Sequence, residues 1–354
     1  MRTIAVLNQK GGVGKTTTVV NIAAALAAAG SRVVVIDFDP QAHLTIHLGL
    51  EPQIVQFGSY QVLTQSAEFE KQILLMRPNL WLLPANINLV GAESELVSVV
   101  GRETILREAL QSSQDKFDYC LIDCAPSLGL LSLNALAAAD DVLIPLQPHF
   151  LALRGFGKLL QTIELVNKRI NPNLKVKWIL LCIFDGRASL PNEVRADVEQ
   201  FLDKARRTNC PWAQAQILPV HIRRNIKLAE APSYGKTIFE YEQNCHGAED
   251  YRKAAELIHA QFQPSTPPDA QPVTISEIQD QPAGDDENQE QLSTISTPSP
   301  QPASQVPPQP STQPVGVDEN QTQPPIEIKS IPQSDSETQS SELTQTKTDQ
   351  PDTN

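Results

Sequence analysis

The chain has few of the features that mark disulfide-bonded, zinc-binding or membrane-spanning proteins. Its 354 residues include five cysteines, an odd number, and none is spaced as a C-x-x-C pair. A disulfide framework or a zinc ribbon would need such pairs, so we expect neither. The sequence also lacks a signal peptide and an uninterrupted run of 18 apolar residues, which disfavours export or a transmembrane helix. We therefore expect a cytoplasmic protein.

Aromatic residues and cysteines are missing altogether from residues 263–354, which hold 16 of the 28 prolines and much Gln, Ser and Thr. Such a segment cannot bury enough apolar surface to offset the entropy lost on ordering, so we predict a disordered tail. The tail carries 15 acidic and two basic residues, which account for the whole formal charge of −13. Residues 1–262 are neutral overall and are long enough for one α/β domain with a hydrophobic core.

Charge within residues 1–262 is divided unevenly. Residues 1–149 contain 9 basic and 14 acidic side chains, whereas residues 150–262 contain 17 and 12. The chain as a whole lacks the basic excess of a nucleic-acid-binding protein, but residues 150–262 have one. This division permits a polyanionic partner without establishing one, because mixed charge on helices is usually a solvated face.

Short apolar runs alternate with helical patterns along the first 262 residues. The runs are rich in Val, Ile and Leu without alternation, as at 32–37 and 119–123, which is typical of strands buried on both faces. We therefore predict a doubly wound, mostly parallel sheet between helices. The expected strands are 3–8, 32–37, 80–83, 118–123, 141–146, 177–184 and 215–219. The expected helices are 16–29, 41–48, 89–98, 102–113, 129–138, 150–169, 189–206 and 247–262.

A glycine-rich loop follows the first strand and precedes the first helix. It reads Asn8-Gln9-Lys10-Gly11-Gly12-Val13-Gly14-Lys15-Thr16-Thr17. Backbone amides in such a loop surround phosphate oxygens, and the helix N-terminus adds positive potential. We expect Lys15 to reach the β- and γ-phosphates of a nucleotide and the Thr16 hydroxyl to bind Mg²⁺. The usual phosphate-loop pattern fails at Gln9, and a second lysine, Lys10, precedes the paired glycines.

Carboxylates end two of the predicted strands. Asp37 and Asp39 follow the second apolar run, and Asp123 ends the run at 119–123. A carboxylate at such a position is costly unless it faces a ligand, a metal or water. We assign Asp123 and Asp37 to the Mg²⁺ site and Asp39 to positioning the attacking water. For Asp39, a turn role before Pro40 is the rival interpretation.

These segments together resemble the ParA/MinD group of deviant Walker ATPases, and most closely its Soj-like ParA branch. The resemblance covers about residues 1–260 and rests on several segments in the family's order. They are N-Q-K-G-G-V-G-K-T-T at 8–17, V-I-D-F-D-P-Q at 35–41, L-I-D-C-A-P-S-L-G at 121–129, A-D-D-V-L-I-P-L-Q at 139–147, L-L-C-I-F-D-G-R at 180–187 and R-N-I-K-L-A-E-A-P-S at 224–233.

The resemblance implies a P-loop ATPase that takes ATP and Mg²⁺ and forms a homodimer around two ATP molecules. Carried onto this chain, Lys15 would act on its own nucleotide and Lys10 on that of the partner subunit. Gly11 and Gly12 would allow the two subunits to approach closely. The implied nucleotide-binding residues are Gly11, Gly12, Val13, Gly14, Lys15, Thr16, Thr17 and Asn225.

The family's ATP-bound dimer binds DNA without sequence preference, and a ParB-like or cargo-adaptor protein stimulates hydrolysis. The resemblance therefore implies a nucleoid-associated ATPase that partitions a chromosome or plasmid. The net positive charge of residues 150–262 agrees with DNA binding. Candidate contacts are Arg187, Arg223, Arg224 and Lys227, with Arg206 and Arg207 behind them.

Three other functions compete with this interpretation. A similar ATPase could position a different cargo, such as a protein organelle or a receptor cluster. A MinD-like membrane regulator would need a terminal basic amphipathic helix, whereas this chain ends in acidic, Pro-rich sequence, so we expect no membrane partner. A metabolic P-loop enzyme, such as an amidotransferase or synthetase, would need a second substrate site, and residues 150–262 show no such constellation.

Overall fold

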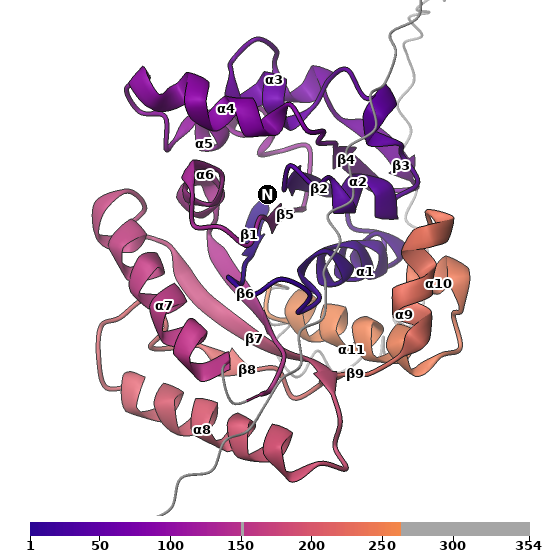
Figure 1. The fold of residues 1–354 in the computed structure, drawn as a ribbon, viewed down its shortest axis with the longest axis vertical. Helices are drawn as coiled ribbons and strands as arrows, with labels where there is room; N and C mark the ends of the chain where they lie inside the picture. The colour runs from indigo at the N-terminus through magenta and orange to yellow at the C-terminus, as the bar shows by residue number, and fades with distance from the viewer. Residues whose placement is uncertain (150–151, 263–354) are drawn as a thin grey trace, which may run out of the picture. The chain divides into compact units, whose positions relative to one another are not determined.

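In the computed structural model, which describes residues 1–149 and 152–262, the strands form one predominantly parallel sheet (Figure 1). The strands are β1 (Arg2–Val6), β2 (Val33–Phe38), β3 (Leu74–Arg77), β4 (Leu80–Leu83), β5 (Tyr119–Cys124), β6 (Asp141–Leu146), β7 (Lys175–Phe184), β8 (Gln216–Ile217) and β9 (Ile222–Arg223). Their order is β3-β4-β2-β5-β1-β6-β7-β8, with β9 paired to β7. The β3–β4 pair is antiparallel and the other pairs are parallel.

Helices cover both faces of this sheet (Figure 1). They are α1 (Lys15–Ala28), α2 (His43–His47), α3 (Ser59–Leu63), α4 (Leu89–Glu95), α5 (Ile105–Ala109), α6 (Leu130–Ala138), α7 (Ala152–Arg169), α8 (Ser189–Ala205), α9 (Ile226–Glu230), α10 (Ile238–Tyr241) and α11 (His246–Ala260). Short 3-10 helices lie at Pro52–Ile54, Phe69–Lys71, Leu96–Ser98, Gln111–Ser113 and Ala231–Tyr234. No helix among the described residues is long and apolar enough to cross a bilayer.

The strands carry apolar side chains on both sides because both sides are buried. In β1, Ile4 and Val6 pack with α1, α2 and α11, whereas Ala5 and the following Leu7 pack with the layer that includes α4, α6 and α7. All four side chains are fully buried. This arrangement confirms the predicted doubly wound α/β fold and explains why its strands show no polar alternation.

The predicted elements agree with the structure except at short or partly exposed segments. Strands β3 and β9 and helices α3, α9 and α10 have no counterpart among the predicted elements, since each has five residues or fewer and carries little periodic signal. The helix predicted at 102–113 is in fact α5 followed by a 3-10 turn. The predicted tail at 263–354 lies outside the described residues, so its disorder stays a prediction.

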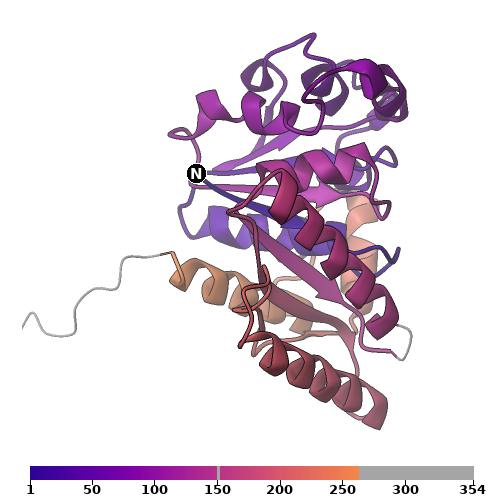
Figure 2. The same cartoon turned by 90° about the vertical axis from the view of Figure 1, so that its left-hand side faces the viewer.

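The topology places the glycine loop and the strand-end carboxylates at one edge of the sheet. The loop follows β1, and β1 lies next to β5, which in turn lies next to β2. Because these strands are parallel, their carboxyl ends meet at the same edge. The N-terminus and the last turn of α11 lie at the other edge (Figure 2), where the Arg2 guanidinium stands 5.0 Å from the Phe262 ring centroid.

Candidate functional site

Asn8 fixes the start of the glycine loop against the end of β6. Its buried side chain donates from Nδ2 to the Pro145 carbonyl at 2.7 Å and accepts from the Lys10 amide at 3.0 Å. Helix α1 then begins without a side-chain cap. Its first-turn amides therefore remain for water or for an anion, and a phosphate at a helix N-terminus satisfies them.

The glycines shape the rest of the loop. Gly12 and Gly14 have φ values of 72° and 94°, a region that favours glycine. A Cβ on Gly14 would meet the Cys182 Cβ at 3.8 Å, so backbone conformation rather than lack of space requires glycine there. Gly11 is exposed, whereas Val13 is buried and anchors the loop. Thr17, in the first turn of α1, accepts a hydrogen bond from Asn21 through its carbonyl.

The two residues expected to bind phosphate and metal lie at the start of α1. Lys15 is buried, and its Nζ donates to the Lys10 carbonyl at 3.4 Å. The Thr16 hydroxyl donates to Asp123 Oδ2 at 2.7 Å. This bond turns the hydroxyl hydrogen toward the carboxylate and leaves the oxygen lone pairs for a cation. The structure thus brings together two of the residues predicted to bind Mg²⁺, and their metal-binding role stays a prediction.

Asp37 and Asp123 occupy paired positions on β2 and β5. Both are almost completely buried. Burial raises the pKa of Asp37 to about 7, although hydrogen bonds from the Thr45 hydroxyl and amide oppose that shift. Burial also raises the pKa of Asp123 well above its ordinary value, and the charge of Asp37 adds to the effect. Two buried carboxylates side by side need a proton or a cation.

The donor set fits Mg²⁺. Within the part of the chain that the structure describes, Asp123 Oδ1 is buried without a hydrogen-bond partner. That same part contains no cluster of three His, Cys, Asp or Glu side chains suited to a metal. Mg²⁺ needs no such cluster, because it usually keeps several waters and takes its other ligands from one or two carboxylates and a nucleotide's phosphates. Thr16 and Asp123 would hold the ion, with Asp37 behind them.

Asp39 lies in the turn after β2 and is half-buried. Its Oδ1 accepts from the Gln41 amide at 3.0 Å, which matches the turn interpretation. Its own amide donates to Asp37 Oδ1 at 3.3 Å, which places it beside the buried carboxylates. Both features are compatible with a carboxylate that reaches a water molecule, and the hydrolytic role of Asp39 stays a prediction.

Lys10 is exposed at the tip of the loop, but its ammonium contacts two side chains of the same subunit. Its Nζ donates to Gln147 Oε1 at 3.2 Å and contacts His149 Nε2. Sequence reasoning missed both partners, as it missed Thr45 beneath Asp37. No pattern marks such residues, because the contacts depend on how β6 and α2 pack against the loop.

Comparison with known proteins shows which family the chain belongs to. A family model described as an AAA domain matches residues 1–176. The chain is 43% identical over 259 residues to the sporulation initiation inhibitor protein Soj of Bacillus subtilis, covering 73% of this chain and 98% of that protein. It is 41% identical over 270 residues to the chromosome partitioning protein ParA of Myxococcus xanthus, covering 75% and 90%. The chain belongs to the ParA/Soj family.

A solved structure supports the same fold for this ParA/Soj chain. It is named as cobyrinic acid a,c-diamide synthase from Mycobacterium smegmatis with bound ADP and magnesium. It is 38% identical, with a TM-score of 0.62, and the match covers 74% of this chain and 96% of that one. The predicted P-loop NTPase fold is therefore confirmed.

The basic residues predicted to contact DNA in this ParA/Soj chain differ in their surroundings. Arg187 and Arg224 are exposed, and neither guanidinium has an ion pair within the described residues. Lys227 is part-exposed and pairs with Glu230 at 2.9 Å. Asn225, predicted to bind the nucleotide, caps α9 by accepting from the Lys227 amide at 2.9 Å. Arg206 is exposed and pairs with Asp203, and its neighbour Arg207 is also exposed.

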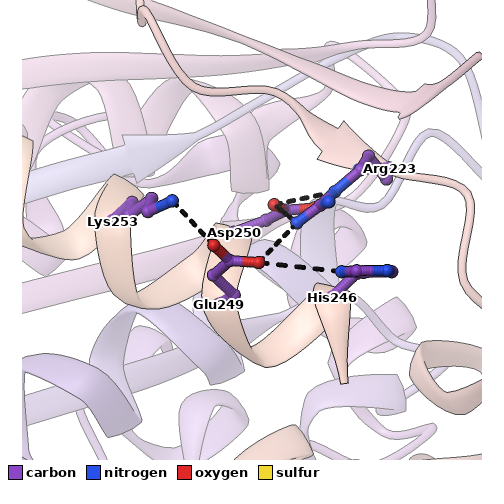
Figure 3. Close-up of polar contacts among 5 residues, drawn as sticks. All are labelled: Arg223, His246, Glu249, Asp250 and Lys253. Atoms are coloured by element: carbon purple, nitrogen blue, oxygen red, sulfur yellow. Dashed lines mark hydrogen bonds and ion pairs between the residues drawn. The ribbon is translucent and has the colours of Figure 1, made fainter. Parts of the chain in front are cut away.

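Arg223 is held inside a network of carboxylates instead (Figure 3). Its guanidinium lies 2.6 Å from the buried Asp250 and 2.8 Å from Glu249, while Glu249 also pairs with Lys253 and His246. The hydrogen bond with Asp250 raises the pKa of Arg223 further above its ordinary value. Arg223 thus ties β9 to α11, and we do not carry it into the proposed DNA interface.

Proposed function

We propose that the protein is an ATP-dependent, dimerising ATPase that binds DNA without sequence preference in its ATP state. In this proposal it positions a chromosome or plasmid, and a ParB-like activator stimulates hydrolysis. The observation that carries the proposal is the loop with two lysines: Lys15 is buried at the start of α1, beside the Thr16–Asp123 pair, and Lys10 is exposed at the tip. The names of the Soj and ParA relatives support the same function.

ATP would lie on the loop with its phosphates at the first turn of α1. Lys15 would exchange the Lys10 carbonyl for a phosphate oxygen, which is a stronger, charge-assisted partner. Thr16 and Asp123 would hold Mg²⁺, which shields the phosphate charge when bound. Asp39 would orient the attacking water from the turn after β2. Val13 and the glycines would give backbone amides to the phosphates.

The exposed Lys10 would complete the site of the other subunit. The phosphates of the ATP bound to the same subunit would already be contacted by Lys15. A cation supplied across an interface stabilises charge on the transferred phosphoryl group. Gly11 and Gly12 beside it leave room for that interface, since no atom lies within 4 Å of a Cβ built on either. Hydrolysis is therefore expected to be slow in separate subunits.

DNA would bind through the basic half of the domain. Arg187, Arg224 and Lys227 are the proposed phosphate contacts, and residues 150–262 carry 17 basic against 12 acidic side chains. Phosphate contacts of this kind are independent of base sequence and release counterions. The proposal thus predicts a steep loss of affinity with salt and equal binding to unrelated duplexes.

The test uses an Asp39→Ala variant, which is expected to bind ATP without turnover and so remain dimeric. Its binding to unrelated duplexes is measured with ATP and Mg²⁺ at several salt concentrations, with ADP as the control. ATP-dependent, salt-sensitive binding that ignores sequence supports the proposal, and binding that ignores the nucleotide contradicts it. A partner captured by the same variant that assembles on a protein organelle or receptor cluster would favour the other cargo. In the chain with the native Asp39, ATP turnover that requires a carboxylic acid and an ammonia donor would favour a synthase.

A further inference from the structure

The Lys10 ammonium is bound within its own subunit by two side chains that follow β6. Gln147 Oε1 accepts from Lys10 Nζ at 3.2 Å, and His149 Nε2 lies at 2.5 Å from the same nitrogen. Both acceptors come from a segment more than 130 residues away in the sequence. Lys10 therefore has a defined position on a single chain, although it is the exposed lysine of the loop.

The backbone beneath these contacts is fixed. Asn8 joins the Pro145 carbonyl to the Lys10 amide, and the Leu7 amide donates to the Leu143 carbonyl at 3.2 Å. The end of β6 and the start of the loop therefore hold a constant separation. The Lys10 carbonyl in turn accepts from Lys15, the lysine that must move to a phosphate when a nucleotide binds. Nucleotide binding thus removes one of the interactions that hold Lys10.

We propose that Gln147 and His149 form a binding site, the cradle, that holds the Lys10 ammonium in the separate subunit. Lys10 must leave this cradle before it can contact the nucleotide of the second subunit. The inference rests on the proposed function, in which Lys10 acts across a dimer. Gln147 and His149 are positioning residues, since they act through Lys10. The cradle holds a subunit in a form that does not assist its neighbour.

The chemistry of the two acceptors makes the cradle sensitive to protons. His149 accepts from an ammonium only when Nε2 is unprotonated, whereas the Gln147 amide oxygen accepts at every pH. Burial and the positive charge of Lys10 both lower the pKa of His149 from its ordinary value. A protonated His149 would repel Lys10, and because the pKa of His149 lies below its ordinary value of 6.5, acidification below that value releases the lysine. Lys10 is the charged group that faces His149 among the described residues.

Two substitutions of His149 separate this role from a purely structural one. His149→Gln keeps an acceptor that does not titrate, so it retains the cradle and loses its pH dependence. His149→Lys places a permanent charge beside Lys10 and removes the cradle. His246→Gln is the matched control, because His246 is an exposed histidine on α11 that pairs with Glu249.

The first measurement is the pKa of His149 by NMR titration of the nucleotide-free full chain, with and without Lys10→Ala. The contact predicts that Lys10→Ala raises the pKa of His149 toward its ordinary value. An unchanged pKa of His149 would overturn the cradle. This result does not depend on ATP turnover or on dimerisation, so it tests the cradle separately from the proposed function.

The second measurement is ATP-dependent dimerisation, followed by sedimentation from pH 5 to pH 8 in the Asp39→Ala background, a range that extends below the ordinary histidine pKa of 6.5. Release of one such charge contact predicts roughly fivefold tighter dimers for His149→Lys at pH 8. The chain with the native histidine should approach that affinity as the pH falls, and the His149→Gln chain should not. Equal affinities and equal pH profiles for the native, His149→Gln and His149→Lys chains would contradict the inference, whereas absence of any ATP-dependent dimer would contradict the proposed function.

Discussion

Asp37 gives the most direct energetic prediction, because its fully buried carboxylate lies on β2 at the position paired with the buried Asp123 of β5. Burial moves its pKa from 3.8 to about 7. Each unit of pKa difference between the folded and unfolded states corresponds to about 1.4 kcal/mol of stability. The shift therefore corresponds to about 4 kcal/mol of folding free energy that depends on the protonation of this one group.

The sign follows from a folded-state pKa that is raised. Protonated Asp37 is favoured in the folded chain, so its contribution to stability is complete below about pH 4. The contribution falls as the pH rises toward 7, because Asp37 loses its proton in the unfolded chain but keeps it in the folded chain. Between pH 5 and pH 8 the metal-free protein should lose about 3 kcal/mol through Asp37 alone.

Asp37→Asn isolates this effect. The amide is neutral at every pH, so it should remove the loss above pH 5. The Asp37 carboxylate accepts from the Asp39 amide and from the Thr45 amide and hydroxyl, and the NH₂ group of an asparagine cannot accept. The loss of one such hydrogen bond offsets about 1 kcal/mol of the gain in stability. The variant should therefore be stabilised by about 3 kcal/mol at pH 8 and be nearly neutral at pH 5. For a domain of this size that is roughly 6–12 °C in Tm at pH 8.

The assay is thermal unfolding of wild type and Asp37→Asn in chelator at pH 5 and pH 8, repeated with Mg²⁺ and a non-hydrolysable ATP analogue. The ligands should stabilise wild type more than the variant, because the cation neutralises a charge that the variant lacks. A variant that is less stable than wild type by the same amount at both pH values would refute the reasoning, since it would mean that Asp37 acts only through its hydrogen bonds.

Two further predictions use matched pairs of variants. Arg223→Ala should destabilise the fold by about 3 kcal/mol, because Asp250 would stay buried without its ion pair. Arg224→Ala should leave Tm unchanged. It should lower the slope of log K for DNA binding against log salt concentration by about 0.9 for the phosphate contact that is lost. Equal effects of Arg223→Ala and Arg224→Ala on Tm would contradict this assignment. Gly14→Ala should lower stability by about 1–2 kcal/mol because of its positive φ. Gly11→Ala, where a Cβ has open space, should leave thermal unfolding unchanged and slow ATP turnover in the dimer.

The fold and the centre of the site could be predicted from the sequence because their signals are local. Strands buried on both faces lack polar alternation, and the loop at 8–17 places its glycines, lysines and threonines within ten residues. The carboxylates Asp37 and Asp123 end apolar runs, and parallel strands bring such ends together. Residue type and spacing were therefore sufficient for these parts.

The remaining parts depend on packing that residue types do not encode. Arg223 and Arg224 are adjacent and chemically identical, yet one is fixed between Asp250 and Glu249 and the other is exposed. Which of the two faces α11 depends on the two-residue strand β9, whose length leaves no periodic pattern. The contacts that hold the Lys10 ammonium likewise require the register of β1 against β6.

The central claim is that Lys10 and Lys15 serve two different nucleotides, and mixing two inactive variants tests it most directly. Lys10→Ala and Lys15→Ala subunits are combined in equal amounts, and ATP hydrolysis is measured with DNA and activator present. If Lys10 acts across the dimer, each mixed dimer regains one of its two sites. Because about half of the dimers are then mixed, the mixture should recover up to about one quarter of wild-type activity. If the mixture stays as inactive as either variant alone while each still folds and the mixed dimer forms, Lys10 acts within its own subunit and the account is wrong.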